Sequence, residues 1–229
     1  MAEVQIRCYE AHDAEDVKDI FILGMSEQVP ATCLHVLKLP HTQVLLVCML
    51  CDLAISKSLL PILVVTLLLA ASWKGISCRF SRFIQTSVNK DLNHIQQTYL
   101  EMPNACFWVA ENQGQVVGLV ACLPAEWDKS SLELKWMSVK RSHRRQGIAK
   151  DLCLTLADFA QEQGYLAVVL YTSVVQTEGQ RVYPKAGSQC GRITEISNDD
   201  HSVTPLCFSK SDNWTDIINN KKAHFPTWY

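Results

Sequence analysis

The sequence predicts an α/β protein in which a mixed β-sheet is flanked by helices and interrupted by an apolar, membrane-anchoring helical segment. Three observations support this prediction. Segments with the periodicity of strands and segments with the periodicity of helices alternate along the chain. The thirty residues from Val44 to Trp73 contain only two charged side chains. A cation-rich loop then joins a strand ending at Val139 to a strongly amphipathic helix that begins at Ile148.

The composition favours a membrane-associated protein. Of the 229 residues, 48% are apolar and 19% are charged, which argues against a disordered chain. The formal net charge of −2 offers no basic face, so we expect no nucleic-acid partner. The length accommodates one α/β domain with an insertion. We expect the first strand and helix in residues 1–42, the membrane-anchoring segment in 43–73, the core domain in 74–190 and an atypical polar tail in 191–229.

The N-terminal segment predicts a strand followed by an amphipathic helix. Residues 4–9 alternate between apolar and polar side chains, as in a half-buried strand. Asp13 is placed to cap a helix, with Asp16 at the capping-box spacing. Apolar residues then recur at helical intervals: Val17, Ile20, Phe21 and Met25.

The apolar segment is long enough to cross a bilayer. Leu53 to Trp73 comprises 21 residues with Lys57 as its one charge. At about 1.5 Å per residue this helix spans about 30 Å, the thickness of a hydrocarbon core. Two alternatives remain open on this evidence: a helical hairpin buried in the protein, and a re-entrant or interfacial hairpin.

Charges around the segment favour one orientation. Lys74, Arg79, Arg82 and Lys90 follow it, whereas few cations precede it, so the positive-inside rule favours a cytosolic C-terminal domain. Asn213-Trp214-Thr215 is a glycosylation sequon, which matters only for the opposite, lumenal orientation.

The second half of the chain predicts the rest of the sheet. We expect a helix over 91–100, a hairpin formed by strands 107–110 and 116–122 with a turn at 112–114, and a strand over 132–139. The amphipathic helix over 148–163 ends at Gly164, and 167–170 is a short buried strand.

Cysteine spacing does not predict a metal site. The ten cysteines are scattered along the chain, and several lie inside apolar runs as small core residues do. Cys48 and Cys51 have redox or zinc spacing, but they lie in the apolar segment without a second ligand pair. We therefore expect no metal.

The stretch from Ser138 to Lys150 carries the chemistry. A strand ends, a cationic loop turns, Gly147 adds no side chain and a helix begins. Successive backbone N–H groups at such a helix start converge on one point and bind pyrophosphate. Arg144 and Arg145 add positive charge. The alternative is a solvated loop with a helix cap.

These residues carry a resemblance to a known family. Arg144-x-x-Gly147-x-Ala149 matches the acetyl-CoA-binding signature of the GNAT superfamily. The run from His143 to Ala149, with the early apolar segment, resembles the camello-like N-acetyltransferases, also called N-acetyltransferase family 8. Other matching pieces are Pro30-Ala31-Thr32, Leu37-Lys38-Leu39-Pro40, residues 106–111, Gln163-Gly164-Tyr165 and Val168-Val169-Leu170. The resemblance covers residues 3–187.

The resemblance implies a GNAT-type sheet and an enzyme that transfers acetyl from acetyl-CoA to an amine at the endoplasmic reticulum membrane. The implied acceptors are cysteine S-conjugates and protein lysines, histone lysines included, and the lipid bilayer is a partner. Camello-type members are linked to cell adhesion during gastrulation. The cofactor-binding loop implied by the signature comprises Arg144, Arg145, Gln146, Gly147, Ile148 and Ala149.

The resemblance also implies catalytic groups. Backbone N–H groups in the region from Met137 to Val139 hold the thioester carbonyl in such folds. Glu133 matches the position of a carboxylate that acts as base through water, and Tyr183 that of a tyrosine that protonates the leaving thiolate. Judged by the residues alone, Glu133 is as readily an exposed strand carboxylate, and Tyr183 an ordinary core tyrosine.

The sequence departs from the family after this point. The family has Leu-Tyr-x-x-x-Gly-Phe, whereas this chain has Val182-Tyr183-Pro184, with Ser188 in place of the aromatic. Pro184 should end or kink the helix that bears Tyr183. Residues 191–229 are polar and weakly periodic, which predicts the absence of the final hairpin. The alternative function is therefore a catalytically impaired pseudoenzyme with a developmental or cell-adhesion role.

Overall fold

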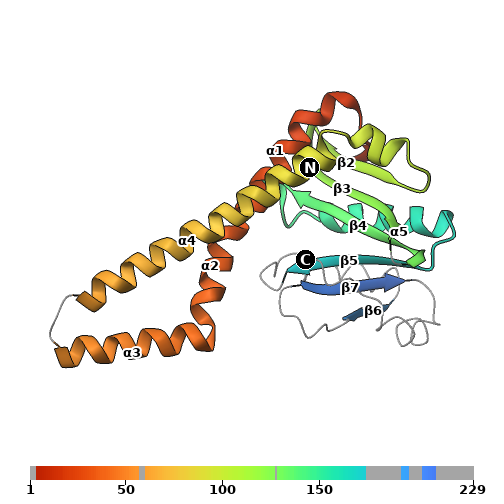
Figure 1. Ribbon diagram of the computed structural model, residues 1–229. Coiled ribbons are helices and arrows are strands. Elements are labelled where there is room, and N and C mark those ends of the chain that lie inside the picture. Colours follow the sequence, from red (N-terminus) through yellow and green to blue (C-terminus); the bar gives the residue numbers. More distant parts are fainter. Residues whose placement is uncertain (1–3, 57–59, 127, 174–191, 196–202, 210–229) are drawn as a thin grey trace. The chain divides into compact units, whose positions relative to one another are not determined.

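The computed structural model describes residues 4–56, 60–126, 128–173, 192–195 and 203–209 (Figure 1). The chain divides into two compact units. The first combines Met1–Gly24 with Asn89–Tyr229, and the second is Met25–Val88. The first unit holds the sheet and the second holds the apolar helices, so the apolar helices form an insertion in the α/β unit.

The first unit is built on a mixed seven-stranded sheet with the order β1-β2-β3-β4-β5-β7-β6. β4 and β5 are parallel, and every other neighbouring pair is antiparallel. This arrangement confirms the predicted α/β class. The strands are β1 (Gln5–Cys8), β2 (Cys106–Asn112), β3 (Gln115–Ala125), β4 (Asp128–Val139), β5 (Ala167–Ser173), β6 (Arg192–Glu195) and β7 (Val203–Ser209).

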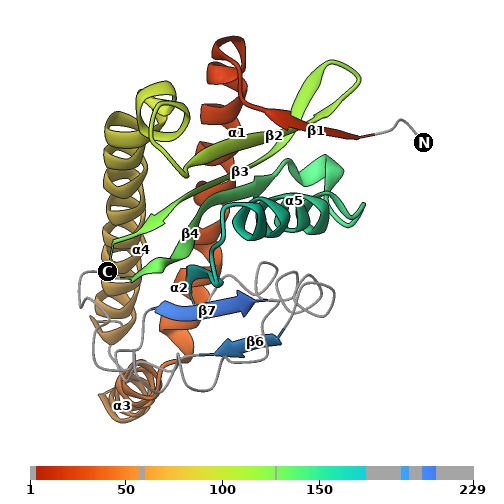
Figure 2. The ribbon, with the colours of Figure 1, turned by 90° about the vertical axis from the view of Figure 1, so that its right-hand side faces the viewer.

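Helices cover both faces of this sheet (Figure 2). On one face, α5 (Ile148–Glu162) packs Leu152, Cys153 and Leu156 against β2, β3 and β4. The opposite face carries α1 (Ala14–Ser26), whose buried side chains are Val17, Ile20 and Phe21. Two π-helical turns, η2 (Val88–Leu92) and η3 (Gln96–Leu100), stand where one helix over 91–100 was expected. The buried side chains of Leu92 in η2, Tyr99 in η3 and Ile95 between them extend the core on this side.

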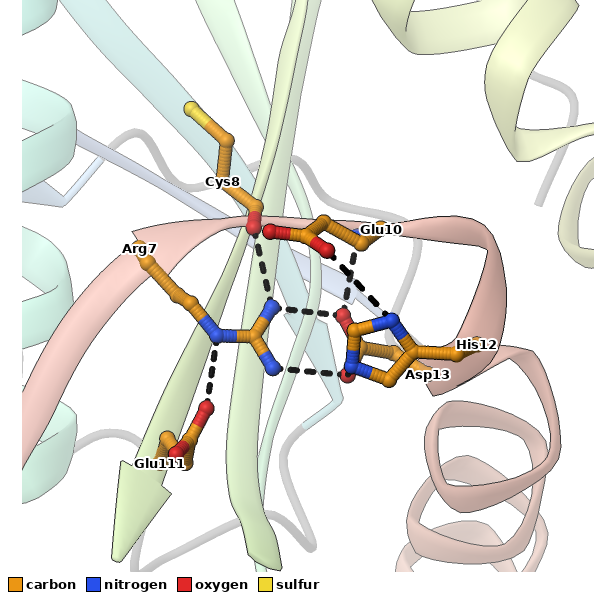
Figure 3. A network of polar contacts seen from close by, with 6 residues as sticks. All are labelled: Arg7, Cys8, Glu10, His12, Asp13 and Glu111. Carbon is orange, nitrogen blue, oxygen red and sulfur yellow. Dashed lines mark hydrogen bonds and ion pairs between the residues drawn. The ribbon is translucent and has the colours of Figure 1, made fainter. Parts of the chain in front are cut away.

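An ion-pair network fixes the start of α1 (Figure 3). Arg7 on β1 donates to both carboxylate oxygens of Asp13, at 2.7 and 2.8 Å, and to Glu111 on β2, at 2.6 Å. Asp13 is only 2% exposed and also accepts the backbone N–H of Glu10 at 2.8 Å. Asp13 is therefore not the predicted N-cap of the long helix. It is the third residue of a short 3₁₀ turn, Ala11–Asp13, whose N-cap is Glu10, and its carboxylate accepts hydrogen bonds from Arg7 and from the Glu10 N–H.

The second unit contains α2 (Gln28–Lys38), α3 (Pro40–Ser56) and α4 (Leu60–Ser87), which contact one another. The stretch Leu53–Trp73, expected as one helix, falls on α3 up to Ser56 and on α4 from Leu60, and residues 57–59 lie outside the described residues. α3 and α4 contact each other, as the two arms of a helical hairpin do. Many apolar side chains of α3 and α4 are exposed: Val44, Leu45, Val47, Leu50, Leu63, Leu67, Leu68, Leu69 and Trp73.

Two helical stretches in the described part of the chain are long and apolar enough to cross a membrane, by length and composition alone. They are Ala11–Lys38 and Leu63–Leu92, and Pro40–Cys51 is a shorter apolar stretch. The first stretch includes α1, which buries Phe21 and its neighbours against the sheet. The second lies mostly in α4 and overlaps the predicted segment.

The C-terminal strands correct another expectation. Residues 191–229 were expected to lack the final hairpin, yet β7 pairs with β5 from Val203 to Phe208, and β6 pairs with β7. Pro205 obscured this strand, because proline cannot donate to a ladder and is rare in central strands. The altered stretch from Val182 to Ser188 lies outside the described residues.

Candidate functional site

The parallel strands β4 and β5 stop pairing with each other before either strand ends. Their ladder runs from Ser131↔Ala167 to Leu134↔Leu170. β4 continues to Val139, whereas Tyr171–Ser173 of β5 pair with β7 on the other side. The last five residues of β4 therefore have no ladder to β5 in the described strands. Ligands of α/β sheets bind at such points, beyond the carboxyl ends of parallel strands.

A β-bulge lies in this unpaired end of β4. Leu119 of β3 pairs with Ser138, and Ala121 pairs with Lys135, so Val120 alone faces both Trp136 and Met137. The extra residue leaves Trp136 at φ 57°, in the left-handed region that non-glycine residues rarely adopt. A bulge turns the backbone that follows it, and here that backbone is Met137 to Val139.

The cationic loop begins where β4 ends. Lys140 N–H donates to Val117 O of β3 at 2.8 Å, which fixes the loop to the sheet. A short 3₁₀ turn, Arg141–His143, leads to Arg144 and Arg145, and Arg145 adopts φ 64°. Gly147 then occupies the N-cap of α5 at φ 92°. The predicted loop and helix start are thus both present.

The start of α5 presents backbone donors. The first N–H groups of a helix have no acceptor within the helix, and no side chain caps this one. Gly147 is exposed, and a side chain built on it would meet only Asp151, at 3.7 Å from its Oδ2. A bulky anion can therefore approach Gly147, Ile148 and Ala149 closely, where the helix dipole favours negative charge.

The two arginines of the signature differ in their surroundings. Arg144 is half-buried, and its Nε donates to Val139 O at 3.0 Å, so it ties the loop back to the end of β4. Arg145 and Gln146 are exposed. Arg144 thus ties the loop before α5 to the end of β4, while Arg145 offers its charge to solvent.

Glu133 lies at the last steps of the β4–β5 ladder, opposite Val169. Its carboxylate is 12% exposed and lies 3.7 Å from Nζ of Lys135. Burial raises the pKa of Glu133, and Glu126 and Asp91 add to the rise, although Lys135 opposes it. A buried carboxylate with a raised pKa is a stronger base than an exposed one, as general-base chemistry requires.

Most of the predicted residues lie on β4 or directly after it. Met137, Val139 and the loop from Arg144 to Ala149 lie at its carboxyl end, whereas Glu133 lies near its middle. Tyr183 lies outside the described residues. Sequence reasoning missed Trp136 and its partner Tyr99. The sequence carried one signal for a bulge at Trp136. Apolar residues alternate at positions 132, 134 and 136 and then continue at 137 and 139, so the alternation shifts by one residue.

Comparisons with known proteins agree with this geometry. Residues 73–187 match the family described as "Acetyltransferase (GNAT) family". The chain is 38% identical to N-acetyltransferase family 8 member 3 of Mus musculus, over 82% of this chain and 86% of that protein. It is also 38% identical to N-acetyltransferase 8B of Homo sapiens (82% and 85%) and 32% identical to the probable N-acetyltransferase camello of Xenopus tropicalis (89% and 94%).

Solved structures share the fold at low identity. An acetyltransferase of the GNAT family from Staphylococcus aureus aligns with a TM-score of 0.59 at 16% identity, over 91% of this chain and all of that one. The PaiA N-acetyltransferase from Thermoplasma acidophilum, solved in complex with coenzyme A, gives 0.55 at 14%, over 90% and 99%. Together with the parted strands, the bulge and the loop, these matches lead to one conclusion. The chain belongs to the GNAT family of acetyltransferases and, within it, to N-acetyltransferase family 8.

Proposed function

We propose that this chain is a membrane-anchored enzyme that transfers the acetyl group of acetyl-CoA to an amine, which is either a cysteine S-conjugate or a protein lysine, histone lysines included. The observation that carries the proposal is the end of β4. There a strained bulge, a strand edge that has no ladder to β5 among the described residues and a helix N-terminus without a side-chain cap come together within fifteen residues.

The loop and α5 hold the diphosphate of CoA in this proposal. Backbone N–H groups of Gly147, Ile148 and Ala149 donate to its oxygens, and the charge of Arg145 adds attraction. The hydrogen bond from Arg144 to Val139 O supports this role, because it fixes the helix start relative to the strand. A solvated loop with a helix cap would need neither this bond nor the exposed glycine.

The backbone from Met137 to Val139 then holds the thioester carbonyl. N–H groups aimed at the oxygen stabilise the negative charge that develops there when the amine attacks. The lack of a β5 ladder along these residues supports the assignment, because a fully paired edge has no donors to offer.

Glu133 acts as the general base through water. The amine nitrogen forms a bond to the carbonyl carbon, the carbon–sulfur bond breaks, and one amine proton passes to Glu133. The raised pKa of Glu133 supports this role against that of an exposed strand carboxylate. Tyr183 gives its proton to the departing thiolate, a role that rests on the family resemblance alone.

The helical hairpin of α3 and α4 anchors the enzyme in the endoplasmic reticulum membrane. Exposed leucine and valine side chains along both helices support contact with lipid. Lys74, Arg79 and Arg82 follow the most apolar part of α4, which favours a cytosolic catalytic domain.

Acetyl transfer to a panel of acceptors tests the proposal. Detergent-solubilised, full-length protein is incubated with labelled acetyl-CoA and either S-substituted cysteines or lysine peptides. We expect one acceptor class to be labelled, and the label to be lost in Glu133→Gln. Normal binding of acetyl-CoA without transfer to any amine would instead favour the pseudoenzyme, to which the sequence from Val182 to Ser188 points.

A further inference from the structure

Trp136 is the strained residue of the candidate site, and neighbouring elements hold it in place. Its φ of 57° lies in a region that side chains with a Cβ avoid, so the conformation persists only where surrounding contacts determine it. Such strain is commonly stored at functional sites. The contacts of Trp136 therefore fix the bulge, and with it the backbone from Met137 to Val139 that follows.

A single hydrogen bond holds the indole of Trp136. Its Nε1–H donates to the hydroxyl oxygen of Tyr99, 2.6 Å away. The two residues are 37 positions apart in sequence, so the bond ties the β4 bulge to the turn η3. The ring of Phe21 on α1 packs edge-on against the same indole, with centroids 5.1 Å apart.

Tyr99 is itself rigidly held. Its side chain is fully buried, and its ring packs edge-on against Phe107 of β2 with centroids 5.5 Å apart. Burial, and secondarily the charge of Asp91, raise the pKa of Tyr99, so the phenol stays neutral and can accept the indole N–H. Tyr99 is therefore a fixed point from which the bulge can be positioned.

The backbone beyond the bulge has a second support. Ser138 Oγ donates to Ile20 O of α1 at 3.3 Å. A side chain on Gly24 would approach Ser138 Oγ within 2.6 Å, so α1 lies close against this residue. The contact holds Ser138 from one side, while the bond to Tyr99 holds Trp136 two residues earlier.

We infer that Tyr99 is a positioning residue for acetyl transfer: by accepting the Trp136 indole N–H, it holds the β4 bulge so that the N–H groups of Met137 to Val139 point at the thioester carbonyl. The inference rests on the proposed function, because it assigns these N–H groups to the carbonyl. It adds a residue pair that touches neither CoA nor the acceptor and acts only through the backbone.

Tyr99→Phe tests the inference, because it removes the hydroxyl and keeps the ring. Tyr9→Phe is the matched control, since Tyr9 is also buried and packs edge-on against Phe107, at 5.4 Å. We expect Tyr99→Phe to lower kcat about tenfold. Misaligned N–H groups at Met137 to Val139 would stabilise the transition state less but would leave the binding of acetyl-CoA unchanged. The KM and the Kd for acetyl-CoA should change less than about twofold, since the diphosphate is held elsewhere. Tyr9→Phe should leave kcat unchanged.

A double-mutant cycle separates positioning from general stability. Trp136→Phe removes the donor, and we expect the double variant to be no slower than Tyr99→Phe, because both substitutions remove the same hydrogen bond between Trp136 and Tyr99. Additive losses of kcat would overturn the inference. So would equal losses of kcat in Tyr99→Phe and Tyr9→Phe, or a loss of acetyl-CoA affinity that parallels the loss of kcat.

Amide hydrogen exchange tests the inference even when the wild type transfers no acetyl group. Such a lack of transfer would refute the proposed function, not the role of Tyr99. Exchange at Met137 to Val139 should be faster in Tyr99→Phe and Trp136→Phe than in wild type, and unchanged in Tyr9→Phe. Unchanged exchange in Tyr99→Phe would show that the bond does not hold the bulge.

Discussion

Replacing Gly147 probes the loop assignment most sharply, because its backbone is left-handed and its surroundings are open. At φ 92° any other residue is strained, by about 1–2 kcal/mol. Steric conflict adds little, since an added Cβ meets only Asp151 Oδ2 at 3.7 Å. At about 2–4 °C per kcal/mol for a protein of this size, Gly147→Ala should lower Tm by about 2–8 °C and leave the protein folded.

Gly147→Glu adds a negative charge where the diphosphate is proposed to bind. Two like charges about 4 Å apart repel by about 4 kcal/mol at an effective dielectric constant of about 20, which corresponds to about 10³-fold in Kd. Gly164→Glu is the matched control. Gly164 follows the opposite end of α5 at φ 76°, and an added Cβ there meets nothing within 4 Å. It carries the same strain without facing the loop.

Isothermal titration calorimetry with acetyl-CoA compares the affinities of the two variants and so separates the effect of charge at the loop from the effect of strain in α5. We expect similar losses of Tm in Gly147→Glu and Gly164→Glu, but loss of measurable binding only in Gly147→Glu. Unchanged affinity in Gly147→Glu would refute the diphosphate assignment. An equal loss of affinity in both variants would show that strain in α5, and not charge at the loop, weakens binding.

Three further predictions concern the base, the ion-pair network and the membrane. Glu133→Gln should lower kcat about 10²-fold and abolish the acid limb of the kcat–pH profile. It should also raise Tm slightly, because a raised pKa means that folding favours the protonated group; an unchanged profile would exclude Glu133 as base. Burial alone would raise the pKa of Asp13, but its bonds with Arg7 and the Glu10 N–H lower it. The Asp13 carboxylate therefore contributes fully to the free energy of unfolding above its unfolded-state pKa of about 4, and this contribution is lost as the pH falls through its folded-state pKa. Asp13→Asn should cost about 3 kcal/mol at pH 7 and flatten the pH dependence of denaturant unfolding, and an equally steep dependence would contradict this account. The full-length protein should stay in the pellet after a carbonate wash and need detergent to dissolve, whereas deletion of residues 40–87 should release it; full-length protein in the supernatant would exclude the anchor.

Local periodicity was sufficient to predict most of the sheet and α5. The helix after Ile148 was predictable because Leu152, Leu156 and Phe159 recur at helical spacing, and the stop at Gly164 followed from its chemistry. Strand β7 was not predictable, because Pro205 interrupts its pattern and its partner residues on β5 lie thirty to forty positions earlier. Pairing across such a distance leaves little trace in local sequence.

Long-range contacts also account for what was missed at the candidate site. Asp13 carries the signal of an N-cap, and only the fold brings Arg7 and Glu111 to its carboxylate. Likewise the phase change at Trp136 indicates a bulge, but no pattern in the sequence pairs Trp136 with Tyr99. The loop at Gly147 was predictable because its residues are contiguous, whereas the groups that position it are not.

A structure of the full-length protein with acetyl-CoA bound is the most direct test of the proposed site. We expect the diphosphate against the N–H groups of Gly147 to Ala149, and the thioester carbonyl oxygen within hydrogen-bond distance of a backbone N–H between Met137 and Val139. Acetyl-CoA bound elsewhere on the sheet, or with its thioester remote from the end of β4, would contradict it.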